Sequence, residues 1–367
     1  AILRSMGAAV GAEELLVTSG AAFTFVYDNA PVYEPLRDLV PEDTVRTGAG
    51  SAGYSGRWLA DVPPGEALEH LAVCLGAGRP ALVSLYAVEG HHGFAVATGY
   101  EPDEGYLLVQ TGERDFQPGM APTVIRIPLS GAWSGAITGP MGWGQCPFFL
   151  PDTSRSAGWS PEGRLYRALM RGAALIRGGT VPYRDCEGAR EFSRVPLAGR
   201  QAHYGLPAFD LLAADLSSVE WLGGFALIWR LDAQLGQLGH HRHAAAGFLR
   251  TVAHPLAGEA ADLCRQTADL AADLASRYWF RPSREATSAA DVMSLAGSRP
   301  AMIYWLNLSD EEQVRLASRM CVVPTAWGPV AIVDSAPRRR DAVALVSRMR
   351  QQEERLANVL TRLAEGL

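Results

Sequence analysis

Residues 71–111 read LAVCLGAGRPALVSLYAVEGHHGFAVATGYEPDEGYLLVQT. Their first positions end an amphipathic helix that starts at Glu66, and Gly76-Ala77-Gly78 terminates it. Three apolar runs, separated by turn residues, follow at 81–86, 94–100 and 106–110. Runs of this length predict strands, and the short acidic turn at 101–105 predicts an antiparallel hairpin. A helix packed on an antiparallel sheet makes α+β the expected fold class.

The composition is that of a globular protein with room for two domains. The chain has 367 residues, of which 48% are hydrophobic and 20% charged, and this size supports two hydrophobic cores. The net charge of −6 argues against a nucleic-acid partner, because neutralising phosphates needs a basic face. We see no apolar run of about 18 residues and no signal peptide, so we expect no membrane contact and a cytoplasmic location.

The pattern of elements changes near residue 150. Residues 151–163 are rich in Pro, Ser and Gly and are typical of a linker. We therefore expect an α+β domain at 1–150 and a mostly α-helical domain at 160–367. Helical periodicity predicts helices at 165–176, 207–216, 219–238, 244–253, 259–279, 309–320 and 341–363.

The usage of Lys and Cys excludes several kinds of chemistry. The chain has no Lys, so all 33 basic residues are Arg, which rules out Schiff-base catalysis and a P-loop. The five cysteines are scattered and form no C-x-x-C pair, which argues against a disulfide framework and a structural zinc site. Cys74 lies on the helix before Gly78, where we expect an inert core thiol.

Two groups of histidines are candidates for chemistry. His91 and His92 stand where a turn enters a buried strand, and the near-neutral titration of imidazole suits a general base. The alternative is a turn pair satisfied by backbone carbonyls. Residues 239–243 carry three further histidines, which are good metal ligands, but no carboxylate is placed beside them and His is common at solvated helix ends. We therefore expect no metal site.

The order of short motifs along the chain is that of a known family. The motifs are Leu3–Gly7, Phe25–Tyr27, Gly78–Val83, His91–His92, Ala95–Tyr100, Gly205–Phe209 and Ala246–Arg250. In this order the chain resembles the butirosin biosynthesis protein H family. The resemblance implies a papain-like N-terminal domain with an antiparallel sheet, followed by a helical domain.

The resemblance also implies acyl transfer in natural-product biosynthesis, antibiotics included. In such a reaction a Cys thiolate attacks an acyl thioester, often on an acyl carrier protein, and the acyl group passes to an amine of a small-molecule acceptor. A His serves as the base, and a carboxylate or amide orients it. No cofactor is implied. Ala1–Gly7 has the pattern of the last residues of a helix. We therefore expect further residues upstream, with the nucleophilic Cys among them.

We prefer His92 to His91 as the general base. In the family the base lies six residues before the Gly of the Gly-Tyr pair, a position that Gly93 holds here. His92 is one residue further away, and a β-bulge between His92 and Gly99 is one way to restore it.

The remaining site residues come from the same resemblance. Gln110 is expected to orient the base, because Thr111 stands where the family has its carboxylate, and Glu113 is the alternative. Phe25 and Tyr27 of the F-x-Y strand are expected to bind substrate.

Two other hypotheses stay open, because no Cys lies between Ala1 and Val73. In the first, the protein is a Cys-less pseudoenzyme, that is, one without the nucleophilic Cys, and it binds a pathway intermediate. In the second, it is a non-covalent catalyst such as a cyclase that uses His92 as its base.

Overall fold

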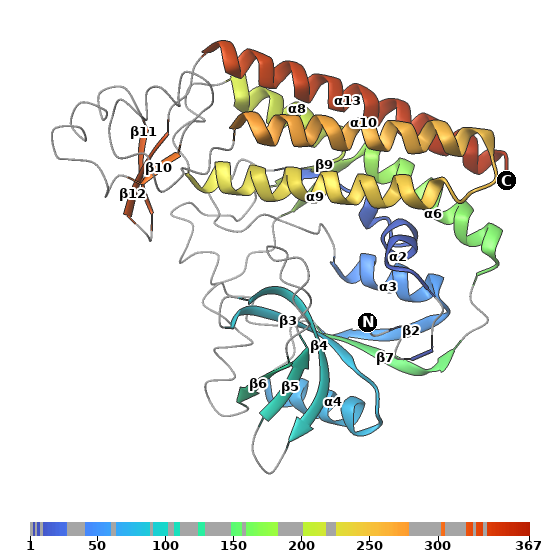
Figure 1. The fold of residues 1–367 in the computed structure, drawn as a ribbon. Coiled ribbons are helices and arrows are strands. Elements are labelled where there is room, and N and C mark those ends of the chain that lie inside the picture. The colour runs from blue at the N-terminus through green and yellow to red at the C-terminus, as the bar shows by residue number, and fades with distance from the viewer. Residues whose placement is uncertain are drawn as a thin grey trace. The chain divides into compact units, whose positions relative to one another are not determined.

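A computed structural model of the chain shows a mixed helix and sheet architecture (Figure 1). The structure describes residues 3, 6–7, 10–27, 41–59, 64–88, 91–101, 106–110, 124–128, 148–155, 159–182, 201–217, 225–278, 302–304, 321–325, 328–332 and 336–367. The chain divides into two compact units that interleave in sequence. The first comprises residues 1–19, 40–165 and 183–198, and the second comprises 20–39, 166–182 and 199–367. The expected domains, 1–150 and 160–367, were contiguous, and the main difference is that residues 20–39 belong to the second unit.

The first unit is built on a six-stranded antiparallel sheet in the order β2-β7-β3-β4-β5-β6. Its strands are β2 (Tyr54–Leu59), β3 (Ala81–Val88), β4 (His91–Glu101), β5 (Tyr106–Gln110), β6 (Val124–Pro128) and β7 (Phe148–Arg155). Its helices include α2 (Ala12–Thr18), α3 (Pro41–Ser51) and α4 (Pro64–Gly76). Consecutive pairing from β3 to β6 makes this part of the sheet a meander.

Strand alternation buries one set of positions in the centre of this sheet. The most buried of them are Ala81, Val83, Ala97 and Val109, each at most 1% exposed. α4 packs against β3, β4 and β7, and it contributes the buried Leu71 and Cys74. The helix ends because Gly78 adopts a left-handed conformation with φ 72, and its amide donates to the Leu75 carbonyl at 2.9 Å.

This arrangement confirms the α+β class and the helix and strand order predicted around the His pair. α4, β3, β4 and β5 overlap the segments expected at 66–75, 81–86, 94–100 and 106–110. The linker predicted at 151–163 is wrong in its first part, because 151–155 complete β7. Pro151 pairs with Gly56 of β2, so pairing within the sheet overrides a composition typical of loops.

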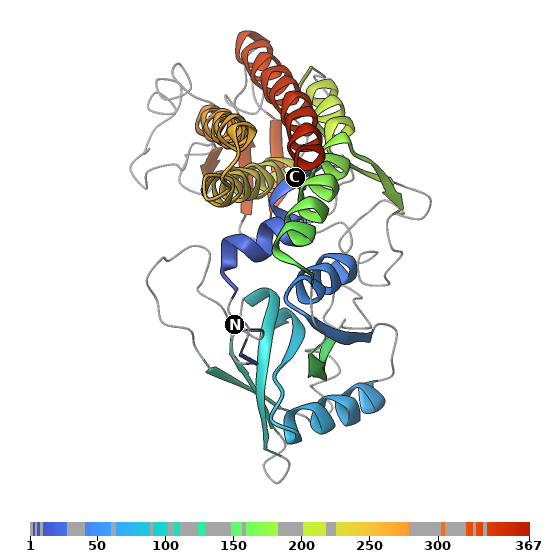
Figure 2. The ribbon, with the colours of Figure 1, turned by 90° about the vertical axis from the view of Figure 1, so that its right-hand side faces the viewer.

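The second unit is mostly helical. Its helices are α6 (Pro161–Arg177), of which the first residues belong to the first unit, α8 (Leu206–Ser217), α9 (Phe225–Leu249), α10 (Pro255–Tyr278) and α13 (Ala336–Glu365). α10 packs against both α9 and α13, and α13 also packs on α8 (Figures 1 and 2). None of the helices that the structure describes combines the length and the apolarity that crossing a bilayer requires.

Most of the predicted helices are found within a few residues of their expected ends. The break expected between helices at 219–238 and 244–253 is wrong, because α9 continues from 225 to 249. Gly239 lies inside this helix, where a Cβ would be 3.9 Å from the Ala268 carbonyl oxygen of α10. This is an ordinary van der Waals distance, so Gly239 faces α10 in the middle of the helix and does not end it. The helix expected at 309–320 lies outside the described residues.

Two three-stranded antiparallel sheets, which the sequence did not predict, also belong to the second unit. One has the order β1-β9-β8, from Val26–Tyr27, Gln201–Tyr204 and Gly179–Pro182; the other has the order β10-β12-β11, from Met302–Tyr304, Gly328–Ile332 and Cys321–Thr325. Strands this short offer too few residues for their alternation to be recognised.

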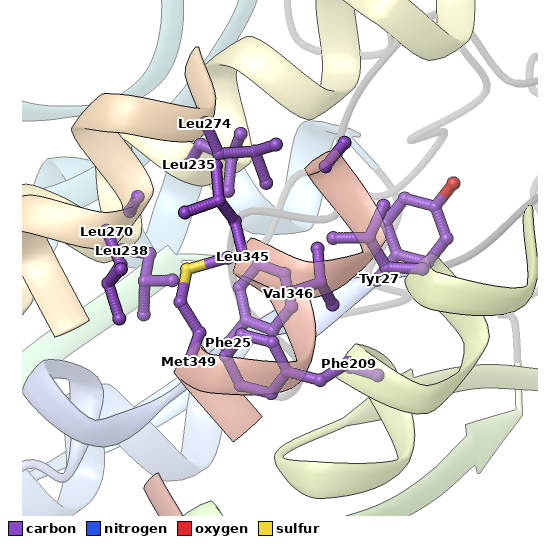
Figure 3. Close-up of a cluster of buried hydrophobic side chains, with 14 of the residues drawn as sticks. Phe25, Tyr27, Phe209, Leu235, Leu238, Leu270, Leu274, Leu345, Val346 and Met349 are labelled. Atoms are coloured by element: carbon purple, nitrogen blue, oxygen red, sulfur yellow. The ribbon is translucent and has the colours of Figure 1, made fainter. Parts of the chain in front are cut away.

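An apolar core joins the helices of the second unit to β1 (Figure 3). Its largest members are Phe25, Tyr27, Phe209, Leu235, Leu238, Leu270, Leu274, Leu345, Val346 and Met349. The Phe25 ring stacks on that of Phe209 with centroids 4.3 Å apart. This contact, with the pairing of β1 to β9, explains why an N-terminal segment belongs to the C-terminal unit.

A buried ion pair crosses the same unit. Arg242 of α9 and Glu353 of α13 are 0% and 1% exposed, and the guanidinium donates to both carboxylate oxygens, at 2.8 and 2.6 Å. It also donates to the Ala22 carbonyl and, at 3.2 Å, to the Phe23 carbonyl of the short 3₁₀ helix η1 (Ala21–Phe23). Burial opposes the charge of Arg242, but the Glu353 carboxylate outweighs it and raises the pKa of Arg242. Two helices and η1 are thus joined through one side chain.

Two glycines allow the backbones that follow α6 and precede α8 to touch. Gly178 has φ 79 and Gly205 has φ 64. A Cβ on Gly178 would overlap the Tyr204 carbonyl oxygen and lie 2.9 Å from the Gly205 Cα. Both positions therefore require glycine for conformation and for space.

We expect Gly178→Ala to lower the free energy of unfolding by at least about 2 kcal/mol, because the methyl group adds left-handed strain to a steric overlap. Urea unfolding followed by circular dichroism measures this. Gly236→Ala is the control: Gly236 is exposed on α9 with no atom within 4 Å of a new Cβ, and its replacement should stabilise by about 0.5–1 kcal/mol. Equal effects of the two substitutions would contradict the backbone contact.

Breaking the buried ion pair should be costly, whereas replacing both partners should not. We expect Arg242→Met or Glu353→Gln to destabilise by about 3–5 kcal/mol, because each leaves a buried polar partner uncompensated. The double variant Arg242→Met/Glu353→Leu should recover much of that loss. Arg350→Met, which breaks the exposed pair of Arg350 with Asp210, should cost at most about 1 kcal/mol. A double variant as unstable as the sum of the singles would contradict the pairing.

Candidate functional site

The structure places His91 and His92 at the first two positions of β4, at the end of the hairpin with β3. His92 pairs with Tyr86 and His91 with Val88. The pairing of β4 with β5 shifts between Ala97 and Gly99, so that Thr98 is an extra residue on β4. A β-bulge thus lies between His92 and Gly99, the interval in which one would shorten the effective spacing of His92 from Gly99 by one residue.

Every second residue along β4 belongs to one alternating set of positions, and His92 belongs to the set that contains Val96. His92 is four residues from Val96, and Val96 pairs directly with Gln110 of β5. His92, Val96 and Gln110 thus belong to one alternating set, whereas the fully buried Ala97 and Val109 belong to the other. Val96 and Gln110 are half-buried.

The register does not bring Gln110 to His92. Four residues along an antiparallel strand span about 13 Å, and this exceeds what one imidazole and one amide side chain bridge with a hydrogen bond. The pairing gives no support to Gln110 as the residue that orients His92. The alternative Glu113 lies outside the described residues.

Phe25 and Tyr27 are placed in the second unit, whereas His92 belongs to the first. Their side chains are 3% and 0% exposed. Phe25 stacks on Phe209, and the Tyr27 hydroxyl donates to Asp215 of α8 at 3.0 Å. Both residues pack the core, and the structure gives no support to contact with a substrate.

Cys74 and Cys264 are unsuited to nucleophilic attack. Cys74 is 2% exposed; burial raises the pKa of its thiol, and Arg79 and Arg57 only partly oppose this. Cys264 is fully buried, and burial raises the pKa of its thiol to about 12. A nucleophile needs an accessible thiolate, so the prediction that Cys74 is an inert core thiol is confirmed.

The three histidines of residues 239–243 lie within α9. His240 and His243 are on its exposed side, whereas His241 is mostly buried. Among the described residues, no group of three His, Cys, Asp or Glu side chains is arranged to hold a metal ion. His241 instead hydrogen-bonds the Ala21 backbone of η1, and burial with the neighbouring Arg242 lowers its pKa to about 4.

Sequence reasoning missed the buried polar side chains of α9. Gln234 is 4% exposed, and neither its amide nitrogen nor its amide oxygen has a hydrogen-bond partner. The Nδ1 atom of His241 is also buried without a partner. The available signal was the spacing of seven residues, which places both side chains on one side of a helix.

The sequence matches no protein-family model, and no curated protein matches it.

Acid should destabilise the protein through His241. Its pKa is about 4 in the folded chain against an ordinary 6.5, so between these values the unfolded chain binds a proton that the folded chain does not. We expect the free energy of unfolding to fall by up to about 3 kcal/mol as the pH drops from 6.5 to 4 and to show no such term above 6.5.

The measurement is chemical unfolding as a function of pH. His241→Gln keeps a donor for Ala21 but does not titrate, so its profile should be flatter over this range. His243→Gln, which changes an exposed histidine of the same helix, should keep the wild-type profile. Identical profiles for the wild type and His241→Gln would contradict the assignment.

Proposed function

We propose that the protein is an acyl-transferring or thioester-cleaving enzyme of natural-product biosynthesis, acting on a carrier-protein-bound or other acyl thioester. The observation that supports this proposal is the bulge at Thr98. It supplies the one-residue correction that His92 needs to take the place of the family's base. The helix α4 against an antiparallel sheet is compatible with the papain-like domain that the resemblance implies.

The base has a defined part in this reaction. A thiol nucleophile loses its proton to His92 and attacks the thioester carbonyl carbon, the C–S bond breaks, and the departing thiolate takes the proton. An amine of the small-molecule acceptor then attacks the acyl-enzyme. His92 accepts the proton of the amine and returns it to the enzyme thiolate as the new amide forms. Attack by water in place of the amine makes the same site a thioesterase.

Burial disqualifies Cys74 and Cys264 as the nucleophile of the covalent route, so this route needs the thiol of another cysteine. The same burial favours a second candidate, a non-covalent catalyst such as a cyclase. There His92 deprotonates the attacking group directly and no thiol is needed. A binding protein for a pathway intermediate is the third possibility. All three proposals assume a cytoplasmic protein with a carrier protein, thioester or pathway intermediate as its partner.

We expect the protein to release thiol from a panel of N-acetylcysteamine thioesters in the presence of amine acceptors. His92→Asn should lower kcat/KM by at least about 100-fold, because general-base assistance is worth that much or more. The measurements are thiol release and the intact mass of the protein after incubation.

His70→Gln is the matched control, because His70 is a half-buried histidine of the same unit that lies 3.7 Å from Glu66 on α4. It should leave turnover unchanged. Turnover with an acyl adduct indicates the covalent route, and turnover without one indicates the non-covalent route. Tight binding of a thioester without turnover would reject catalysis in favour of the binding protein.

A further inference from the structure

The strand register gives the proposed base His92 a neighbour that the sequence analysis did not consider. The pairs of β4 with β5 begin at Val96, four residues beyond His92. Within the described part of the sheet, only β3 is paired with β4 at His92, and the residue directly opposite is Tyr86. Since the register gives no support to Gln110, β3 is the strand from which an orienting group can come.

The register between β3 and β4 is regular up to this pair. Six consecutive pairs run from Ala81 with Ala97 to Tyr86 with His92. Directly opposite residues of an antiparallel pair have Cβ atoms about 4.5–5.5 Å apart. The extra residue of β3, Ala87, comes only after the last of these pairs, so the bulge there leaves Tyr86 opposite His92.

The neighbouring positions of β3 are less suited to orient His92. Ser84 is one pair position further back on the same alternating set, and Val88 lies beyond the bulge. Val88 has no polar group, and a diagonal partner is about 7–8 Å away, which suits aromatic and long side chains better than a serine. A tyrosine hydroxyl both donates and accepts hydrogen bonds. Tyr86 therefore combines the nearest position with a suitable group.

We propose that Tyr86, directly opposite His92 on the β3–β4 ladder, is the residue that positions the base. In this proposal its phenolic oxygen accepts a hydrogen bond from Nε2–H of the neutral imidazole, because both atoms stand far out from the Cβ of their own residue. Nδ1 is then left to take the proton of the attacking group. The inference rests on the proposed function and deepens it, since it assigns the tautomer of the base.

The tautomer can be measured without any turnover, in protein that carries ¹⁵N-labelled histidine. The two ring nitrogens have well-separated chemical shifts in a single neutral tautomer, and the shifts approach each other when tautomers exchange. At a pH where His92 is neutral, we expect well-separated shifts with Nε2 protonated. Tyr86→Phe, which removes only the hydroxyl, should narrow the separation. The signals of His92 are those that disappear in His92→Asn.

The thioester assay supplies a second readout. Tyr86→Phe should lower kcat by about tenfold, the effect of one lost hydrogen bond. It should leave KM within about twofold, because a positioning residue acts through the base and does not contact the substrate. Ser84→Ala, the matched control on the same strand, should change neither kcat nor the ¹⁵N shifts of His92. Circular dichroism checks folding, and Tyr86→Leu serves if Tyr86→Phe is not folded.

The two readouts separate this inference from the proposed function. A narrowed shift separation in Tyr86→Phe without any thioester turnover supports the hydrogen bond to His92 and rejects the proposed enzyme. Turnover that depends on His92, with the kcat and the ¹⁵N shifts unchanged in Tyr86→Phe, overturns the positioning role and leaves the proposed function standing. Mixed tautomers in the wild type, or the same change of shifts in Ser84→Ala, also overturn it.

Discussion

The charge of Arg242 has to be neutralised away from water, and the helical unit is arranged around that requirement. The guanidinium donates to Glu353 on α13 and to two carbonyls of η1, so α9, α13 and an N-terminal segment are held at one point. A buried charge without such partners costs several kcal/mol. Burial of Cys264 beside the pair and the neutrality of His241 next to it follow from the same arrangement. β1, which continues from η1, can then pair with β9 and add Phe25 to the core.

In the first unit the corresponding constraint is the register of the central hairpins. The extra residue at Thr98 shifts every earlier position of β4 by one relative to β5, and a one-residue shift exchanges the two faces of a strand. His92 alternates with Val96 in any case, and the bulge decides that Val96, not Ala97, is the residue that pairs with Gln110. The same register keeps Gln110 four positions from His92. The pairing register thus gives no support to Gln110 as the group that orients a His92 base.

Both units bury residues of reactive or aromatic types in their cores. Cys74 and Cys264 are core thiols whose pKa values burial raises, and Phe25 and Tyr27 pack an apolar cluster. Conversely, Gln234 looks like an ordinary helix residue and proves to be a buried amide without partners. Burial thus decides which residues of reactive types are accessible for chemistry. It also decides which polar groups lack a hydrogen-bond partner.

The sequence alone determined the α+β class, the order of α4, β3, β4 and β5, and most helices of the second unit, because these depend on local periodicity and on Gly and Pro at the ends of elements. The bulge between His92 and Gly99 was only an option that the family resemblance offered, and the structure contains one there. Only the tertiary structure decided that β1 joins the C-terminal unit, that 151–155 complete β7, and that α9 continues through Gly239. Each of these depends on a partner far away in the chain: β9, β2 and α10. Local patterns carry no information on which distant segment supplies the missing hydrogen bonds or the packing surface.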